Sequence, residues 1–229
     1  MSEPMRIALV GATGLVGRAV VEAAVGRPDL QLVAIARHAM PLPHGARMEL
    51  LVADTDGWAD ALERSRARVL ISALGTTWKQ SGRSEANFRA VDRDLVLDTA
   101  RAAHSGGVKR MVAISSIGAD AEAKGFYLRV KGEVERDLRT VGFDRTDILR
   151  PGLLRGQRNG DRRWMERLGI AVSPVTDLML QGRLRKYRSI RDAQVAQAAL
   201  TFAMRKADGN FVHEHDAIAS AARQFAPPE

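Results

Sequence analysis

The 229-residue chain contains no cysteine, which excludes disulfide bonds, thiolate metal sites and thiol nucleophiles. It also lacks long apolar runs, because stretches such as RVLISALG and RMVAISS are far too short to cross a bilayer. The first residues, MSEPM, have neither a basic start nor an apolar core, so we expect no signal peptide. These absences favour a cytoplasmic protein with no membrane-spanning segment.

Aromatic residues are scarce at 5% of the chain, whereas 35 Lys and Arg outnumber 27 Asp and Glu and give a net charge of +8. The basic residues are scattered among acids, as in EVERDLR and VDRD, and no basic block has interleaved aromatics. This pattern indicates a solvated Arg-rich surface and no nucleic-acid partner. A positive surface would still attract small phosphorylated molecules.

Short apolar runs alternate with longer amphipathic ones, which is typical of βαβ units around a parallel sheet. Uninterrupted apolar strands favour burial on both faces, so we expect a doubly wound sheet with helices on both sides. The strands are expected at residues 5–10, 30–37, 47–54, 68–74, 109–116 and 143–152. Helices are expected at LVGRAVVEAAV, at WADALERS, from Glu85 to about His104 and around Tyr127.

The pattern weakens after Gly152, and no flexible linker follows. We expect one domain over residues 1–229, with a cofactor-binding core at 5–152 and a substrate or cap region at 153–229 packed on it. The segments GDRRWMERLG and SPVTDLMLQG are expected as short helices, IRDAQVAQAALTFAMR as a longer helix and NFVHEHD as a late strand.

The first strand leads directly into GATGLVG, a GxxGxxG spacing. Such a loop needs glycine where the strand bends, where backbone approaches a pyrophosphate, and where the helix packs against the sheet. Glycines also serve plain tight turns, but a strand before and a helix after are the context that nucleotide binding requires. The predicted contacts in this loop are Gly11, Thr13, Gly14, Leu15, Val16 and Gly17.

The second strand ends in AIARH, with Arg37 where an acid would accept the ribose hydroxyls of NAD. A guanidinium at this position offers charge to a 2′-phosphate, so Arg37 favours NADP over NAD, although it could also be an ordinary surface arginine. His38 could pair with the same phosphate or lie exposed. Asp54 could contact the adenine amino group or cap the ADTD segment.

Tyr127 and Lys131 stand at i and i+4 of an expected helix, so their side chains are neighbours. An ammonium near a phenol lowers the pKa of the phenol, which could then exchange a proton with a carbonyl or alcohol oxygen. Lysine could also bind the nicotinamide ribose. In AISSIGAD, Ser115 and Ser116 supply hydroxyls at the carboxyl end of a strand, where doubly wound sheets bind ligands.

The order of GATGLVG, SALGTT, SS, YLRVK and LRPG over about residues 5–155 resembles the short-chain dehydrogenase/reductase superfamily, which has a Rossmann-type fold. LGTTWKQSG, VDRDLVLDTARAAHSGGVKRMVAISSIGAD, FYLRVKGEVE and FDRTDILRPGLLRGQR are most similar to an atypical branch, the Tat-interacting-protein-like oxidoreductases, whose members bind NADPH.

The resemblance implies a role for each matched residue. Tyr127 corresponds to the general acid/base, Lys131 to its partner and cofactor ligand, and Ser116, rather than Ser115, to the hydroxyl that binds substrate. Asp92 stands where many members have asparagine. Further cofactor contacts are implied at Leu74, Gly75, Thr76 and Pro151.

Two functions remain open at this point. One is an NADPH-dependent oxidoreductase that acts on a small carbonyl or alcohol substrate, as a monomer or homodimer. The alternative is an NADPH-binding regulatory or scaffold protein with a protein partner. Trp78 and Lys79 could shape the substrate cleft or fill a loop, and Trp164 is expected as a core anchor or lid. His213 and His215 are expected on one face of a strand with no third metal ligand.

Overall fold

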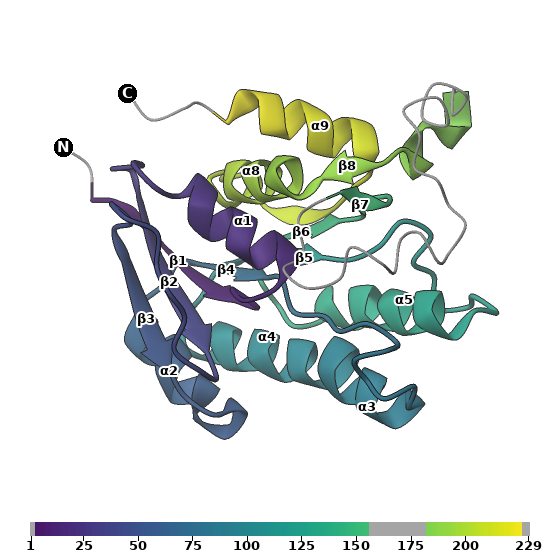
Figure 1. Ribbon diagram of the computed structural model, residues 1–229, viewed down its shortest axis with the longest axis horizontal. Coiled ribbons are helices and arrows are strands. Elements are labelled where there is room, and N and C mark those ends of the chain that lie inside the picture. The colour runs from purple at the N-terminus through teal and green to yellow at the C-terminus, as the bar shows by residue number, and fades with distance from the viewer. Residues whose placement is uncertain (1–2, 156–181, 226–229) are drawn as a thin grey trace.

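A parallel β-sheet occupies the centre of the computed structural model, which describes residues 3–155 and 182–225 (Figure 1). Its seven strands have the spatial order β3-β2-β1-β4-β5-β6-β9, and all six neighbouring pairs are parallel. The strands are β1 (Met5–Val10), β2 (Leu30–Ala36), β3 (Met48–Val52), β4 (Val69–Ser72), β5 (Arg110–Ile114), β6 (Arg145–Leu149) and β9 (Gly209–His213). The strand order reverses between β1 and β4, which is where doubly wound sheets bind ligands.

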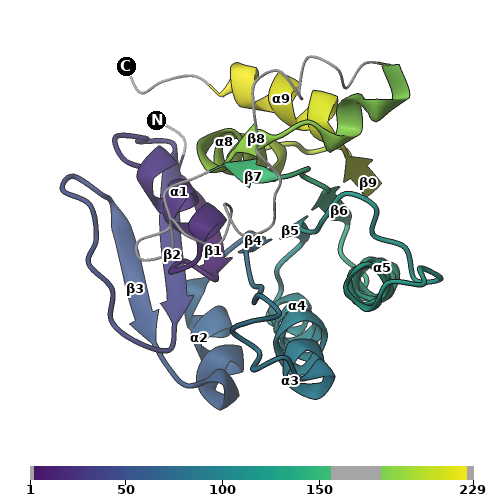
Figure 2. The same cartoon turned by 45° about the vertical axis from the view of Figure 1, so that its right-hand side comes forward.

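Helices cover both faces of this sheet, as Figure 2 shows. One face carries α1 (Leu15–Ala23), α8 (Asp192–Ala203) and α9 (His215–Gln224). The other carries α2 (Trp58–Ser65), α3 (Glu85–Arg89), α4 (Leu95–Ser105) and α5 (Phe126–Leu138). Successive side chains of a strand point to opposite faces, so Ile7 and Leu9 join one apolar core while Ala8 and Val10 join the other. The expected Rossmann-type doubly wound fold is confirmed.

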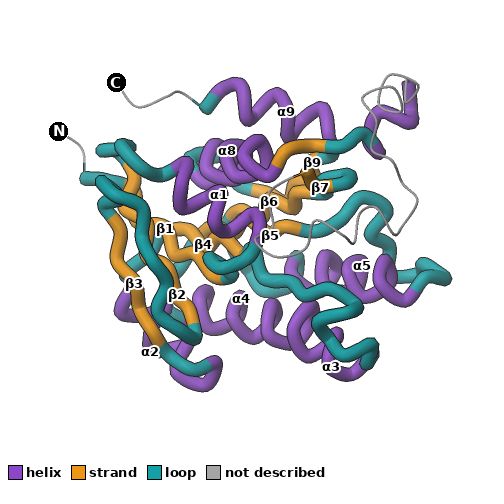
Figure 3. Tube along the Cα trace, in the orientation of Figure 1, coloured by secondary structure: helices purple, strands orange, loops and turns teal. Residues whose placement is uncertain are grey.

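The six expected strands are present, each inside its predicted range, and Figure 3 shows them as a central layer between the helices. The helix predicted from Glu85 to about His104 is interrupted. A π-helical turn, η2 (Ala90–Asp94), separates α3 from α4. Such turns often occur at functional sites, and this one contains the buried Asp92.

The late strand predicted in NFVHEHD is β9, which pairs with β6 at the edge of the sheet. A short two-stranded sheet joins β7 (Leu154–Arg155) to β8 (Ile190–Arg191), and a 3₁₀ segment, η3 (Gly182–Tyr187), precedes β8. The two short helices predicted in GDRRWMERLG and SPVTDLMLQG, and Trp164 with them, lie outside the described residues.

Candidate functional site

The turn from β1 into α1 is a glycine cradle. Gly11 has a φ of +81°, and a Cβ there would lie 2.5 Å from the carbonyl carbon of Ala73. A Cβ on Gly17 would lie 2.1 Å from the carbonyl oxygen of Gly11. Both distances are too short for any real side chain. Only glycine at these two positions therefore lets the turn, α1 and the end of β4 lie this close together. Helix α1 begins here with Gly14 as an N-cap that makes no side-chain hydrogen bond and with no acidic residue in its first turn, which leaves its first N–H groups open to an anion.

A cavity of about 980 Å³ lies above this cradle, at the carboxyl ends of β1, β2 and β4. Its volume lies in the range of small-molecule and cofactor sites. The predicted contacts that line it are Gly11, Thr13, Gly14, Leu15, Arg37, Leu74, Gly75 and Thr76. The predicted contacts that do not line it are Val16, Gly17, Asp54, Lys131 and Pro151. Val16 and Gly17 are buried beneath the cradle, whereas Asp54 lies exposed at the start of a 3₁₀ turn.

Several cavity residues were not predicted from the sequence. Arg18 lies one turn into α1 and lines the cavity together with Arg37 and His38. Helical periodicity could have identified it, because Arg18 follows Gly14 at i+4. Asp192 is the first residue of α8, and only the tertiary fold places it at the cavity. The other unpredicted polar residues of the lining are Glu22 and Gln80.

Lys131 and Asp92 form a buried ion pair beside the cavity. The Nζ atom of Lys131 lies 2.7 Å from Oδ1 of Asp92, while Oδ2 of Asp92 accepts the backbone N–H of Thr76 at 2.7 Å. Burial lowers the pKa of Lys131, but the charge and hydrogen bond of Asp92 and the interaction with Tyr127 outweigh it, so this pKa lies above its ordinary value. Lys131 is therefore an ammonium at neutral pH.

Tyr127 lies one turn before Lys131 in α5, with 43% of its surface exposed. Its ring packs edge-on against Phe88, with the centroids 5.7 Å apart. The sequence predicted that the ammonium of Lys131 interacts mainly with the phenol of Tyr127. In the structure the ion-pair partner of that ammonium is Asp92, and the phenol interacts with it electrostatically.

The two serines after β5 have different partners. Ser115 donates to Oε1 of the buried Glu135 at 2.5 Å, and Glu135 also binds the guanidinium of Arg150, at 2.6 Å for Nη2. Among the described residues, the hydroxyl of Ser116 makes only a long contact of 3.4 Å, to the carbonyl oxygen of Ile117. The hydroxyl of Ser115 thus makes a structural hydrogen bond within the fold, whereas that of Ser116 is available to a ligand.

Pro151 is buried, and its carbonyl oxygen accepts the N–H of Ile117 at 3.0 Å. This bond ties the serine segment to the end of β6. Gly132 fixes the other side of the segment, because a Cβ there would lie 2.1 Å from the backbone of Asp120 and Ala121. The loop between β5 and α5 is therefore pressed onto the helix that carries Tyr127 and Lys131.

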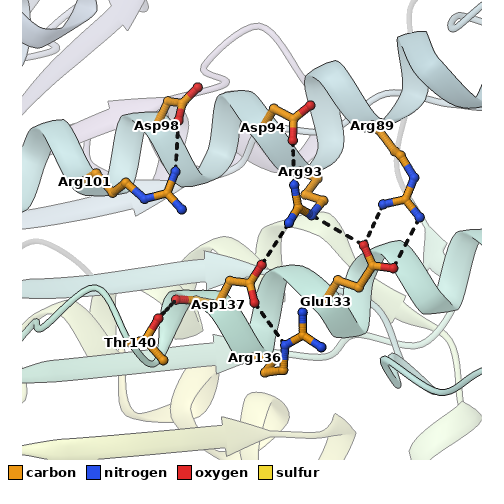
Figure 4. Close-up of polar contacts among 9 residues, drawn as sticks. All are labelled: Arg89, Arg93, Asp94, Asp98, Arg101, Glu133, Arg136, Asp137 and Thr140. Atoms are coloured by element: carbon orange, nitrogen blue, oxygen red, sulfur yellow. Dashed lines mark hydrogen bonds and ion pairs between the residues drawn. The ribbon is translucent and has the colours of Figure 1, made fainter.

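A network of ion pairs holds α5 against the helix that contains η2 (Figure 4). Glu133 accepts Arg89 at 2.6 Å, and Arg93 reaches both Glu133, at 3.4 Å, and Asp137, at 3.1 Å. Each link joins α5 to α3 or η2, so the network fixes the two helices along adjoining faces. Asp92 and Lys131 are thereby kept opposite each other.

The histidine prediction is wrong. The strand ends at His213 and α9 begins at His215, so the two side chains do not share a strand face. His213 stacks on Phe202 and contacts Asp147 at 2.7 Å, which joins β9 to β6, and His215 pairs with Asp216. Among the described residues, no three His, Asp or Glu side chains are grouped to hold a metal ion.

Comparison with known proteins agrees with this geometry. A family model described as NAD(P)H-binding matches residues 11–206. A mitochondrial protein named fmp52 from Emericella nidulans is 38% identical over 163 residues, which cover 68% of this chain and 70% of the relative. The mitochondrial protein FMP52 of Candida albicans is 31% identical over 207 residues, which cover 88% of this chain and 89% of the relative.

Solved structures share the fold at lower identity. A Bacillus halodurans protein named as an NAD-dependent epimerase/dehydratase superposes with a TM-score of 0.70 at 20% identity, over 96% of this chain and 99% of its own. The Bordetella bronchiseptica enzyme WbmG in complex with NAD superposes with a TM-score of 0.65 at 17% identity, over 93% of this chain and 73% of its own. At these identities the likeness establishes the fold.

The expectation of a cytoplasmic protein is wrong by this comparison, since the relatives are named mitochondrial proteins. A cysteine-free composition fits any reducing compartment and so could not distinguish between them. Within residues 3–155 and 182–225, no helix has the length and apolar character to span a membrane. The glycine cradle, the cavity and these relatives together show the family. The chain belongs to the NAD(P)H-binding family, among the FMP52-like members of the atypical short-chain dehydrogenases/reductases.

Proposed function

We propose that this protein is an NADPH-dependent oxidoreductase that reduces the carbonyl group of a small organic substrate. The observation that carries the proposal is the position of the Lys131–Asp92 pair. A Cβ on Gly75, which lines the cofactor cavity, would lie 3.9 Å from Nζ of Lys131 and 3.4 Å from Oδ1 of Asp92. The ammonium of Lys131, paired with Asp92, thus lies directly behind a residue of the cavity wall and one helical turn from Tyr127.

The residues present fit a dinucleotide. The glycine cradle admits backbone-to-phosphate approach, and the start of α1 favours negative charge. Arg18, Arg37 and His38 bring basic side chains to one cavity, and Arg37 directly follows β2, where an acid would select NAD. Glu22 and Asp192 are acidic residues in the same lining. Because the residue that directly follows β2 is an arginine and not an acid, we infer a preference for the 2′-phosphate of NADPH over NADH.

Reduced dinucleotide supplies a hydride for the carbonyl carbon when it is bound. The chain's own groups then act on the carbonyl oxygen. Ser116 is proposed to donate a hydrogen bond to it, and Tyr127 to transfer its phenolic proton to it, so that the carbonyl becomes an alcohol. The Lys131 ammonium stabilises the phenolate that remains. Asp92 keeps Lys131 charged and oriented while this occurs.

The contact between Lys131 and Asp92 also favours a second candidate. The ammonium of Lys131 pairs with a carboxylate and not with the phenol, so this arrangement does not require Tyr127 to transfer a proton. Under this alternative, the protein senses NADPH and presents a surface to a protein partner without turnover. The two candidates share the cavity and differ in whether Tyr127 and Ser116 act on a substrate.

Titration of the purified protein with NADPH and NADH, followed by nicotinamide fluorescence, tests the cofactor assignment. We expect saturable binding, tighter for NADPH. Oxidation of bound NADPH by members of a broad aldehyde and ketone panel then separates the two candidates. Binding without oxidation across the panel contradicts the reductase and supports the sensor, and failure to bind either dinucleotide contradicts both.

A further inference from the structure

Four aromatic rings from three separate segments form one continuous cluster, which we term the aromatic platform. Trp78 packs on Phe126 with centroids 5.8 Å apart, Phe126 on Phe88 at 5.6 Å, and Phe88 on Tyr127 at 5.7 Å. Every contact is edge-to-face, the arrangement that aromatic pairs prefer. Only 5% of the chain is aromatic, so this concentration next to Tyr127 calls for a physical reason.

The platform has a buried centre and two exposed ends. Phe88 is 1% exposed, whereas Trp78 is 45% and Tyr127 is 43% exposed. The guanidinium carbons of Arg89 and Arg129 lie 5.6 and 5.9 Å from the ring centroid of Phe126. Phe126 is thus partly covered by neighbours, and the most exposed rings of the platform are those of Trp78 and Tyr127.

Trp78 is held in a defined position at the rim of the cofactor cavity. Its carbonyl oxygen accepts the hydroxyl of Ser81 at 2.9 Å and the N–H of Arg83 at 3.0 Å. The residues around it along the chain, Thr76 and Gln80, line the cavity. The exposed indole therefore belongs to a hydrogen-bonded turn that borders the cofactor site on one side and contacts the α5 aromatics on the other.

A solvent-exposed indole in the same aromatic cluster as a proton donor suits a flat apolar ligand. Ring-on-ring contacts contribute about 0.5–1.5 kcal/mol beyond the burial of their area. A saturated chain of similar size gains only the free energy of burying its apolar surface. The four rings of the platform are uncharged, and the guanidinium groups of Arg89 and Arg129 lie against Phe126. A neutral ring placed against Trp78 therefore loses little on leaving water, whereas a charged group would lose its hydration.

We propose that the aromatic platform is the substrate-binding surface, and that it selects carbonyl compounds in which the carbonyl is attached to an aromatic ring. The ring rests against Trp78 and the carbonyl oxygen faces the hydroxyl of Tyr127. This assignment rests on the proposed reductase function and specifies its substrate class.

Binding can be measured apart from turnover. The full chain is loaded with NADP⁺, which has no hydride to give, and titrated with 2-acetonaphthone by ligand-observed NMR. We expect Trp78→Ala to weaken binding about three- to tenfold, the loss of one ring contact, and Trp78→Phe to restore most of it. Val212→Ala, an exposed apolar residue on edge strand β9, is the matched control and should bind as the wild type does. The same titration with 2-decanone should show little dependence on Trp78.

Each outcome bears on one of the two proposals. Equal binding of 2-acetonaphthone by wild type and Trp78→Ala, or no binding by the loaded wild type, overturns the platform assignment. Reduction of aliphatic ketones as efficiently as of 2-acetonaphthone by the wild type, with both rates unchanged in Trp78→Ala, also overturns it but keeps the reductase. If Trp78→Ala loses binding of 2-acetonaphthone but keeps binding of 2-decanone and its affinity for NADPH, the assignment is supported.

Discussion

The Nζ atom of Lys131 lies 2.7 Å from Oδ1 of Asp92, and the two side chains are only 8% and 1% exposed. Asp92 simultaneously accepts the N–H of Thr76, so a single carboxylate joins α5 to the cavity-lining segment after β4. A buried pair of this kind adds little net stability against an apolar pair. Removal of one partner, however, leaves an uncompensated buried charge, which typically costs about 3–5 kcal/mol.

Asp92→Asn should therefore lower the free energy of unfolding by about 3 kcal/mol. An amide can still accept the N–H of Thr76, but it supplies no charge to Lys131, whose pKa burial then lowers. Urea denaturation at neutral pH measures the loss. Asp98→Asn is the matched control, because Asp98 pairs with Arg101 at the exposed surface, where such a change costs under about 1 kcal/mol. Equal losses in the two variants would contradict a structural role for the buried pair.

Gly17→Ala should abolish or strongly weaken NADPH binding, by more than tenfold. A Cβ at this position would lie 2.1 Å from the carbonyl oxygen of Gly11, so the cradle has to move away from its present position. Fluorescence titration measures the affinity. Gly125→Ala provides the comparison, since a Cβ there meets nothing within 4 Å and the residue lies outside the cavity lining. Unchanged affinity in Gly17→Ala would show that the dinucleotide does not use this loop.

Arg37→Ala should reduce NADPH affinity about tenfold while NADH affinity changes little. Loss of one charge-assisted hydrogen bond to a phosphate accounts for this size. Arg139→Ala, which removes an exposed arginine at the end of α5, controls for the general effect of net charge. Parallel losses for both dinucleotides would mean that Arg37 does not recognise the 2′-phosphate.

Glu133 should make the protein sensitive to acid. The hydrogen bond from Arg89 lowers the pKa of Glu133 below its ordinary 4.5. A lowered pKa means that the native state holds this group charged, so its contribution is present above pH 4.5 and is lost as the pH falls through the native pKa. Glu133→Gln should flatten the decline in unfolding free energy below that pH. Glu63→Gln, on the exposed side of α2, should follow the wild-type curve.

The layout of the fold could be read from the sequence because its strands are short, uninterrupted apolar runs. Within the run RVLISAL, for example, the four residues VLIS form the completely buried β4, and this apolar pattern needs no long-range information. Likewise GATGLVG identified the cavity, since the spacing of its glycines reflects local backbone geometry. These signals are contained within a few neighbouring residues.

The details of the site depend on contacts that no local pattern encodes. The π turn at Asp92 adds a residue to one helical turn without a distinctive sequence, so the ion pair with Lys131 was not predicted. Asp192 reaches the cavity only because α8 packs beside α1. Local spacing could not separate the roles of Ser115 and Ser116, which only the family resemblance distinguished, because Glu135, the partner of Ser115, lies 20 residues away in α5.

The proton-transfer role of Tyr127 is tested most directly by single-turnover oxidation of NADPH, with a carbonyl substrate from the panel, in the wild type and in Tyr127→Phe. The variant removes one oxygen and keeps the ring contact with Phe88. We predict that its turnover falls by at least a hundredfold, the size of a lost general acid, while its NADPH dissociation constant stays within about twofold. Turnover equal to that of the wild type would contradict the reductase mechanism.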